Sequence, residues 1–382
     1  MFGLEKDLIS FVLTDTTVKI AQIQGAPNAP RLVNIVKRDV RDLPPEELAS
    51  VVQSCLNSIG VKRASAICCL PSSVAITKNI EIPSIDPVEI KSIIDLQAGR
   101  HTPYAREEII IGYINIGVYQ RNYTKVLLII INRQVIKKQL DILAAAGVMT
   151  QKVVFAPEGK ASFYGRILEL KQSEMPIGII DISKYTTDFN IELNNTVIAC
   201  RSIPVGMDNL LKEGQPAREK LIQELGASLE SYQSEDISRP PETFVLANDD
   251  AKVKELEPLL KEKLKANVKV LPYLDHITAS QPVMLKIVSE FDDESILDCL
   301  APIFAMTPMK VDLTPDEVKV QHSIEEKGKQ IVMAGIFGAV LLLLICGIFF
   351  SKLYFSGQRL SMLTEEYQSK HKTVQELEEI ST

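Results

Sequence analysis

Few residues in this chain have the types and spacing of a catalytic site. The best candidates for such a site lie in one turn. The region from Asp181 to Asp188 combines two carboxylates with several hydroxyl groups. Ser72 and Ser73 lack the flanking glycines of a nucleophile elbow, and neither a Walker loop nor a GxGxxG motif occurs. The four histidines show no metal-ligand spacing: His101, His276, His322 and His371. The sequence therefore predicts no catalytic residue and no dedicated metal site.

The turn itself could bind a phosphate. A carboxylate at the end of a strand, followed by small residues with hydroxyl groups, can place Asp181 near a metal-bound phosphate. Thr186, Thr187 and the turn amides could then hold phosphoryl oxygens. The same residue types are also common turn formers, and on local sequence alone a plain β-hairpin is the favoured interpretation.

Two stretches of the chain share one pattern of strand, polar turn and strand. Ile177–Ile182 and Asp188–Leu193 flank the candidate turn, and Thr196–Cys200 follows as a third strand. Near the N-terminus, residues 8–24 are apolar and partly alternating on both sides of Thr14-Asp15-Thr16-Thr17. Such an internal echo predicts a duplicated α/β architecture.

The remaining segments alternate between amphipathic helices and short apolar strands. Helices are predicted at 45–59, 87–98, 134–146, 217–232, 251–264 and 294–304. Strands are predicted at 64–70, 108–117, 125–132, 244–246 and 268–271.

An uncharged apolar run, Ile331–Phe350, stands near the C-terminus between lysines on both sides, Lys327 and Lys329 before it and Lys352 after it. A helix needs about 20 apolar residues to cross a bilayer, and a buried core helix of this length would show polar interruptions. Residues 1–7 lack the basic and apolar regions of a signal peptide. We therefore expect a single-pass membrane protein, with a cytoplasmic N-terminal body and a short tail on the other side of the membrane.

Beyond the span, Leu353, Leu360, Tyr367 and Val374 recur every seven residues, and Leu363 lies three after Leu360. This spacing predicts a coiled coil, and an amphipathic surface helix is the alternative. We expect residues 309–330 to form a charged linker, 331–350 a transmembrane helix and 351–382 a periplasmic coiled-coil segment.

Charge and cysteine content exclude some classes of protein. The net charge is −7 and the basic residues are scattered, so no nucleic-acid surface is predicted. The six cysteines form no CxxC pair, which is typical of buried thiols in a reducing compartment rather than of disulfides or a zinc site.

The second hairpin, followed by Arg201-Ser202-Ile203-Pro204-Val205-Gly206, resembles the second phosphate-binding hairpin of actin-like ATPases. More narrowly, it resembles the PilM family of type IV pilus assembly proteins. Further likenesses follow in the family's order at Leu70–Thr77, Ile80–Pro83, Gln97–Tyr104, Leu221–Tyr232 and Phe244–Leu246.

This resemblance implies a duplicated actin-like (ribonuclease H-like) α/β fold with an inserted small α+β domain, followed by one transmembrane helix and the start of a coiled coil. The first half would span 1–172, with the insertion at about 72–150, and the second half 173–308. A residual nucleotide site, taking ATP with magnesium weakly, would consist of Asp181, Ser183, Thr186, Thr187 and Gly206.

Three loops depart from the family pattern. Val12, Leu13 and Thr14 stand where the first hairpin carries Asp-Ile-Gly, and Ser183 replaces a glycine of the second. Ala247-Asn248-Asp249-Asp250 replaces a Gly-Gly turn. A valine cannot contact a hydrated cation as a carboxylate does, and a Cβ hinders close approach of a phosphate to the backbone. Efficient ATP turnover is therefore not expected, while weak nucleotide binding stays open.

The C-terminal part resembles PilN, the bitopic partner of PilM, and Val311–Pro315 loosely echoes the Asn-Leu-Leu-Pro motif that precedes the PilN span. GspL of type II secretion is similar in plan. The favoured hypothesis is a non-catalytic scaffold of a pilus or secretion inner-membrane platform. Its body would bind cytoplasmic partners such as the assembly ATPase, and its tail would pair with another bitopic protein through Leu353, Leu360, Leu363 and Tyr367.

Two alternatives are an active PilM-like ATPase that drives assembly and an FtsA-like filament former. The full apolar span argues against the second, because that family usually reaches the membrane through an amphipathic helix.

Overall fold

The structure is a computed structural model of the 382-residue chain. It describes residues 7–61, 64–170, 175–248, 250–291 and 293–380. The chain divides into two compact units, Met1–Pro315 and Asp316–Thr382. The predicted start of the second half, at 173, lies outside the described residues.

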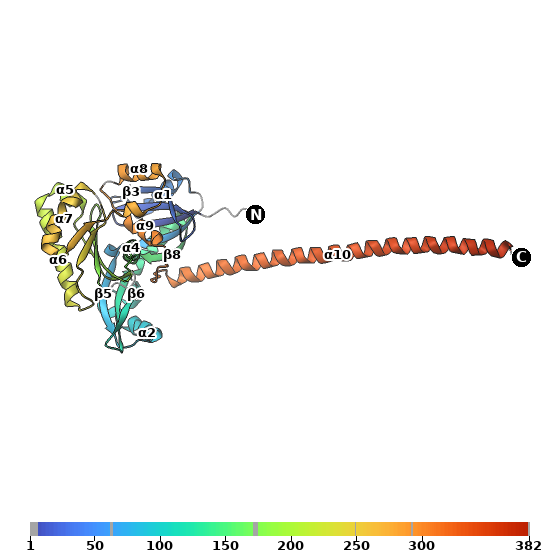
Figure 1. Ribbon diagram of the computed structural model, residues 1–382, viewed down its shortest axis with the longest axis horizontal. Coiled ribbons are helices and arrows are strands. Elements are labelled where there is room, and N and C mark those ends of the chain that lie inside the picture. Colours follow the sequence, from blue (N-terminus) through green and yellow to red (C-terminus); the bar gives the residue numbers. More distant parts are fainter. Residues whose placement is uncertain (1–6, 62–63, 171–174, 249, 292, 381–382) are drawn as a thin grey trace. The chain divides into compact units, whose positions relative to one another are not determined.

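The first sheet of the larger unit has five strands in the order β3-β2-β1-β4-β8. Its two edge strands, β3 and β8, are labelled in Figure 1. The β1–β2 hairpin and β3 are antiparallel, whereas β4 and β8 run parallel to β1. A parallel sheet needs cover on both faces. Helices α1 and α3 contribute to one apolar core, and α4, α8 and α9 to the other. The strands are β1 (Asp7–Leu13), β2 (Thr17–Gln24), β3 (Arg31–Asp39), β4 (Ala64–Leu70) and β8 (Met149–Phe155), and the helices are α1 (Pro45–Ser58), α3 (Arg133–Ala145), α4 (Ala156–Ile167), α8 (Gln281–Glu290) and α9 (Leu297–Phe304).

The second sheet repeats this plan in the order β11-β10-β9-β12-β13. Its first three strands are antiparallel, and β12 and β13 are parallel to β9. A third apolar core joins one face to helices α5, α6 and α7. These elements are β9 (Ile177–Ile182), β10 (Thr187–Leu193), β11 (Thr196–Ile203), β12 (Thr243–Leu246), β13 (Asn267–Val270), α5 (Met207–Lys212), α6 (Gln215–Ser234) and α7 (Ala251–Leu264).

A three-stranded sheet of order β5-β7-β6 lies between β4 and α3 in the chain. It consists of β5 (Ala75–Ile82), β6 (Ile109–Tyr119) and β7 (Tyr123–Asn132). Helix α2 (Pro87–Gln97) packs its Ile90 and Ile94 against this sheet. The helix begins there because the Asp86 side chain accepts hydrogen bonds from the Val88 and Glu89 amides.

Both predicted hairpins form, at β1–β2 and β9–β10. The helix predicted over 294–304 begins only at Leu297. Strands β3, β5 and β8 and helices α4, α5 and α8 were not predicted. Helix α4 gives no amphipathic signal in the sequence, because every residue from Ala156 to Gly165 is buried. A helix buried all round has no polar face and so no amphipathic period.

The charged linker predicted over 309–330 takes another form in the structure. Val311, Leu313 and Thr314 are buried in the larger unit, and helix α10 begins at Asp316. The apolar side chains at alternate positions allow an extended segment to pack on a surface. The side chains of Lys327 and Lys329, and the whole of residues 1–6, lie outside the described part of the chain.

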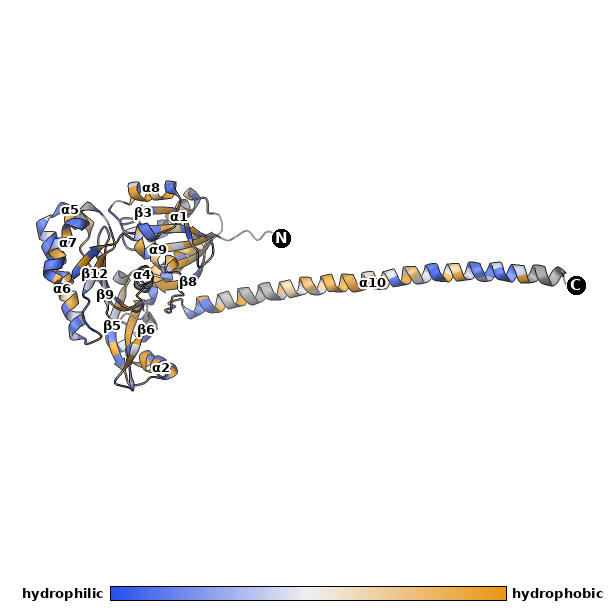
Figure 2. Ribbon diagram, in the orientation of Figure 1, coloured by the Kyte–Doolittle hydropathy of each residue, from blue (hydrophilic) through white to orange (hydrophobic). Residues whose placement is uncertain are grey.

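The smaller unit is one helix, α10 (Asp316–Ile380), of 65 residues. Its segment Val332–Val374 is long and apolar enough to cross a membrane, and an 18-residue stretch within it has a mean hydropathy of 2.8 and no buried residue. Figure 2 shows the apolar stretch of α10 giving way to a polar one toward the C-terminus. The predicted span 331–350 lies in this helix, although the Ile331 side chain is outside the described set.

Candidate functional site

The second hairpin places two acids side by side. Asp181 near the end of β9 and Asp188 on β10 are direct cross-strand neighbours, so their side chains lie on one face of the sheet. They are 2% and 5% exposed. Buried carboxylates this close together require compensation by a cation or by hydrogen bonds. The Ser72 hydroxyl supplies one such bond, to Asp188 Oδ1 at 2.7 Å.

Lys160 of α4 supplies the cation. Its Nζ lies 2.7 Å from Asp181 Oδ2 and 2.5 Å from Asp188 Oδ2, and 2.7 Å from Asp298 Oδ1 of α9. The contacts to Asp181 and Asp188 are hydrogen bonds; that to Asp298 is an ion pair only. We call these four residues the Lys160 cluster.

The electrostatics of the cluster follow from its burial. Burial by itself lowers the pKa of Lys160, yet the three carboxylates together hold it well above its ordinary value. Burial raises the pKa of Asp188, which the Lys160 ammonium opposes. Lys160 therefore carries its charge inside the protein.

The first hairpin has a different charge pattern. Val12 is fully buried, and Lys19 on β2, its cross-strand neighbour, is 3% exposed. The Lys19 ammonium lies 2.6 Å from Glu294 and donates to the Ser295 carbonyl at 2.7 Å. Although burial opposes it, Glu294 holds the pKa of Lys19 above its ordinary value.

The turn of the first hairpin is satisfied by its own chain. The Thr14 side-chain oxygen accepts from the amides of Thr16 and Thr17 at 3.3 and 3.0 Å. The Thr14 amide donates to the Thr17 carbonyl. Thr14 thus serves as a turn former.

The other predicted site residues lie in and around the second turn. The Ser183 hydroxyl donates to Glu294 at 3.1 Å, and the Thr187 hydroxyl to the Val205 carbonyl at 2.7 Å. The Thr186 carbonyl accepts from the Ser183 amide. Gly206 is the residue before α5.

Gly206 lets α5 approach the turn closely. A Cβ there would lie 2.5 Å from the carbonyl oxygens of Ser183 and Lys184. Those two carbonyls accept from the amides of Met207 and Asp208. The start of α5 is therefore bonded to the protein's own turn.

The loop after β12, the third predicted departure, also turns inward. Asn248 Oδ1 accepts from the Ile182 amide at 3.1 Å, and the Ala247 amide donates to the Ile180 carbonyl at 2.9 Å. Asp249 lies outside the described residues.

These residues do not fit a magnesium–nucleotide complex. The carboxylates that a metal would need are bonded to an ammonium, and Val12 offers no ligand. With Lys160 in place, the described residues contain no group of three or more His, Cys, Asp or Glu side chains suited to hold a metal ion. No catalytic step through a nucleotide follows from this geometry.

A second feature lies at the end of the larger unit, where residues 309–315 bind to its surface. We call this segment the strap. Two of its amides, those of Lys310 and Val311, donate to the carboxylate of Glu158 at 2.5 and 3.1 Å. Burial raises the pKa of Glu158, and these amides oppose the shift.

The strap also pairs with the edge of β8. The Leu313 amide donates to the Val153 carbonyl at 2.9 Å, and the Val153 amide donates to Thr314 Oγ1 at 2.9 Å. Val311 and Leu313 approach Gly112 of β6 so closely that a Cβ there would lie 2.7 Å from Val311. The strap thus contacts both the first sheet and the small inserted sheet.

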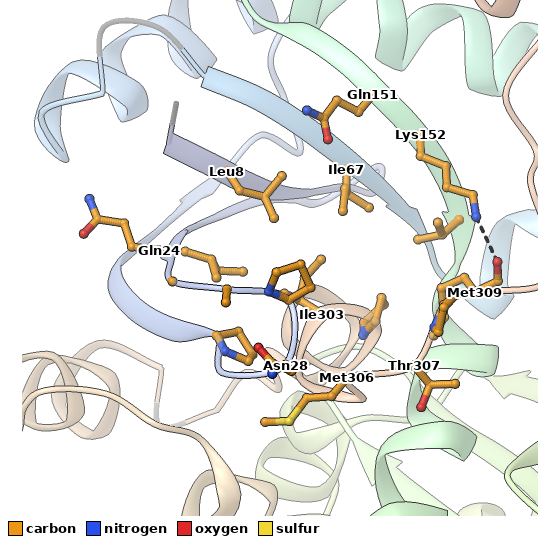
Figure 3. Close-up of a pocket in the computed structure, with 18 residues that line it drawn as sticks. Leu8, Gln24, Asn28, Ile67, Gln151, Lys152, Ile303, Met306, Thr307 and Met309 are labelled. Carbon is orange, nitrogen blue, oxygen red and sulfur yellow. Dashed lines mark hydrogen bonds between the residues drawn. The ribbon is translucent and has the colours of Figure 1, made fainter. Parts of the chain in front are cut away.

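An apolar pocket of about 570 Å³ opens beside the start of the strap (Figure 3). Lys152 at its rim donates to the Met309 carbonyl at 2.8 Å. Its apolar lining includes Leu8, Ile23, Ile67, Val154, Ile303 and Met306.

The predicted tail residues all lie on α10. Leu353, Leu360, Leu363 and Tyr367 are 63–71% exposed. Large apolar side chains this exposed on a helix are typical of an interaction surface.

Sequence reasoning missed Lys160, Asp298, Glu158 and Lys19. One signal for α4 was available: Pro157 at the first turn of a helix, where proline is favoured. A lysine and a glutamate within an otherwise small and apolar stretch were a second signal of buried pairing.

Two five-stranded sheets of the same order, with a three-stranded sheet inserted in the first half, define an actin-like α/β fold. The chain belongs to a family of that class: the family model described as type IV pilus assembly protein PilM matches residues 22–215. No curated protein matches the chain.

One solved structure agrees with this fold. The chain is similar to one in a PilM-PilN type IV pilus biogenesis complex, with a TM-score of 0.65, 16% identity, and coverage of 79% of this chain and 99% of that one. It also matches the cytoplasmic domain of EpsL, an inner membrane component of the type II secretion system of Vibrio cholerae. That match has a TM-score of 0.43 and 10% identity, covering 75% and 94% of the two chains. A Bacteroides thetaiotaomicron protein with an actin-like ATPase fold gives a TM-score of 0.44 and 11% identity, covering 78% and 96%.

Proposed function

We propose that this protein is a non-catalytic scaffold of an inner-membrane platform for type IV pilus or type II secretion assembly. Family membership and the actin-like body support the assembly role, and α10 supports a single membrane crossing. The body would consist of halves 1–172 and 173–308, with the small domain inserted at about 72–150. It would lie in the cytoplasm, and the end of α10 in the periplasm.

The observation that carries this proposal is the strap. It is bonded to the body by the Glu158 carboxylate and the β8 edge. Helix α10, which carries the candidate span from Val332 onward, starts at the next residue, Asp316. The solved PilM-PilN complex is named for two proteins. Here a PilM-like body and a PilN-like membrane segment would belong to one chain.

Partners would bind at both ends of this arrangement. The exposed stripe Leu353, Leu360, Leu363 and Tyr367 would pair with another bitopic platform protein in the periplasm. The body would bind cytoplasmic partners, an assembly ATPase among them.

Crosslinking of the full chain in membranes, with a reagent that does not react with cysteine, tests the tail pairing. Leu360→Asp with Leu363→Asp should abolish the crosslinked species, because charges at inner positions disrupt a coiled coil. Met362→Asp is the matched control, since Met362 is equally exposed (67%) but lies outside the stripe. Unchanged crosslinking in the double variant would reject the pairing role.

The alternative function is that of a PilM-like ATPase. Asp181 supports this alternative, because it provides the carboxylate expected of a second phosphate-binding hairpin. This alternative predicts heat on titrating the full chain in detergent with ATP and magnesium, lost in Asp181→Ala. No heat at millimolar ATP would exclude it.

A further inference from the structure

The ammonium of Lys160 has the surroundings of a bound cation. It lies 2.5–2.7 Å from three carboxylates, hydrogen-bonded to Asp181 and Asp188 and ion-paired with Asp298, and the Lys160 side chain is fully buried. Calcium–oxygen distances are about 2.3–2.6 Å and magnesium–oxygen distances about 2.0–2.1 Å. The three carboxylates are thus spaced around the ammonium much as they would be around a large, hard cation.

The Lys160 cluster also connects the two halves of the body. Lys160 lies on α4 in the first half, whereas its three carboxylates lie in the second. Asp181 and Asp188 are on the second sheet, and Asp298 is on α9, which contacts β1, β2 and β4 of the first sheet. Helix α4 shares an apolar core with α9 and contacts β10 and β11. A cation at this point therefore holds the second sheet to a helix that packs on the first sheet.

The carboxylates of the cluster offer more ligand atoms than the lysine uses. Asp181 Oδ1 is buried and has no hydrogen-bond partner among the described residues. A buried carboxylate oxygen without a donor is costly, and a divalent cation is the kind of ligand that would use it.

We propose that Lys160 is a built-in cation that fills what would otherwise be a divalent-cation site, and that it keeps the two halves together without metal or nucleotide. This rests on the proposed scaffold function and explains how an actin-like body would keep a fixed shape while partners assemble on it. Removing the lysine uncovers the site: Lys160→Ala leaves three carboxylates and the space of the missing side chain.

Thermal unfolding of the full chain in detergent tests this directly. Wild-type protein should show the same Tm in EDTA, calcium, magnesium and Mg-ATP, because its site is already filled. Lys160→Ala should lose about 10 °C, given the cost of leaving buried carboxylates unpaired. Millimolar calcium should restore at least about half of that loss through binding to the folded state alone.

Lys19→Ala is the matched control, because Lys19 is also a buried lysine but lies against one carboxylate, Glu294. It should be destabilised and should not respond to calcium. If Lys160→Ala does not accumulate, Lys160→Ala with Asp188→Asn replaces it, since this pair of changes leaves two carboxylates and less repulsion.

The outcomes separate this inference from the proposed function. A folded Lys160 variant that gains nothing from calcium or magnesium overturns the inference and leaves the scaffold role intact. Stabilisation of the wild-type chain by Mg-ATP overturns the inference and favours the ATPase alternative. If the wild type gives no crosslinked species, the tail pairing is rejected, and the inference about Lys160 is unaffected.

Discussion

The two hairpins at the centre of the body have the same backbone and opposite chemistry. Each turn closes with one hydrogen bond, from Thr14 to Thr17 in the first and from Ser183 to Thr186 in the second. Counted from these bonds, the cross-strand pair Val12 and Lys19 of the first hairpin corresponds to Asp181 and Asp188 of the second.

The difference shows that two hairpins can share one backbone arrangement while their buried side chains carry opposite charges. The first hairpin holds a lysine that needs an acid from elsewhere, Glu294. The second holds two acids that need a lysine from elsewhere, Lys160. Both hairpins are neutralised by the protein's own side chains, which leaves little for a charged ligand to bind.

The largest test of this comparison exchanges each buried lysine for methionine. Lys160→Met leaves three carboxylates unpaired and should lower the free energy of unfolding by about 5 kcal/mol, whereas Lys19→Met leaves one and should cost about 3 kcal/mol. Denaturant unfolding of the full chain in detergent measures both. Equal losses would mean that the two sites are electrostatically alike after all.

A pH experiment examines the far end of the second hairpin, where Glu192 lies at the position of Ile23 in the first. Glu192 is 1% exposed, and burial raises its pKa to about 8 from the ordinary value of 4.5. As pH rises from 4.5 to 8, the unfolded state ionises before the folded state does, so the wild type loses stability over that window.

Glu192→Gln removes this titration. Its stability relative to wild type should rise by about 3 kcal/mol between about pH 5 and pH 8 and then level off. Glu230→Gln, an exposed change on α6, is the control and should show no such slope. A flat difference for Glu192→Gln would indicate that the carboxylate is ionised in the folded protein.

The turn of the second hairpin depends on the close approach of α5. Gly206→Ala forces a Cβ against two carbonyl oxygens at 2.5 Å, which should cost about 2 kcal/mol. Gly226→Ala, in the interior of α6 with no atom within 4 Å of the new Cβ, should instead stabilise by about 0.5–1 kcal/mol. Opposite signs in thermal unfolding support the packing; matching signs count against it.

The smallest expected effect concerns the turn of the first hairpin. Thr14→Ala removes the acceptor for the amides of Thr16 and Thr17 and should cost about 1 kcal/mol. Asp15→Ala changes the exposed neighbour and should stay within about 0.5 kcal/mol of wild type. If both variants matched the wild type, Thr14 would have no part in holding the turn.

Sequence alone determined the features that depend on neighbouring residues. Alternation of apolar side chains predicted both hairpins, and an uncharged run predicted the apolar part of α10, because each pattern lies within a short stretch of chain. The ordered likenesses predicted the PilM family. The same reasoning expected a charged linker where the strap binds, since the fit of Val311 and Leu313 against β6 depends on a surface built elsewhere.

Tertiary structure alone decided the chemistry of the site. Lys160 lies 138 residues before Asp298 in the chain, and nothing local shows that their charges meet. Helix α4 is buried on every side, so the periodic signal that reveals other helices is missing from it. The sequence could point to Asp181 as a carboxylate of the second hairpin. Only the packing of α4 decided that Lys160 would neutralise it.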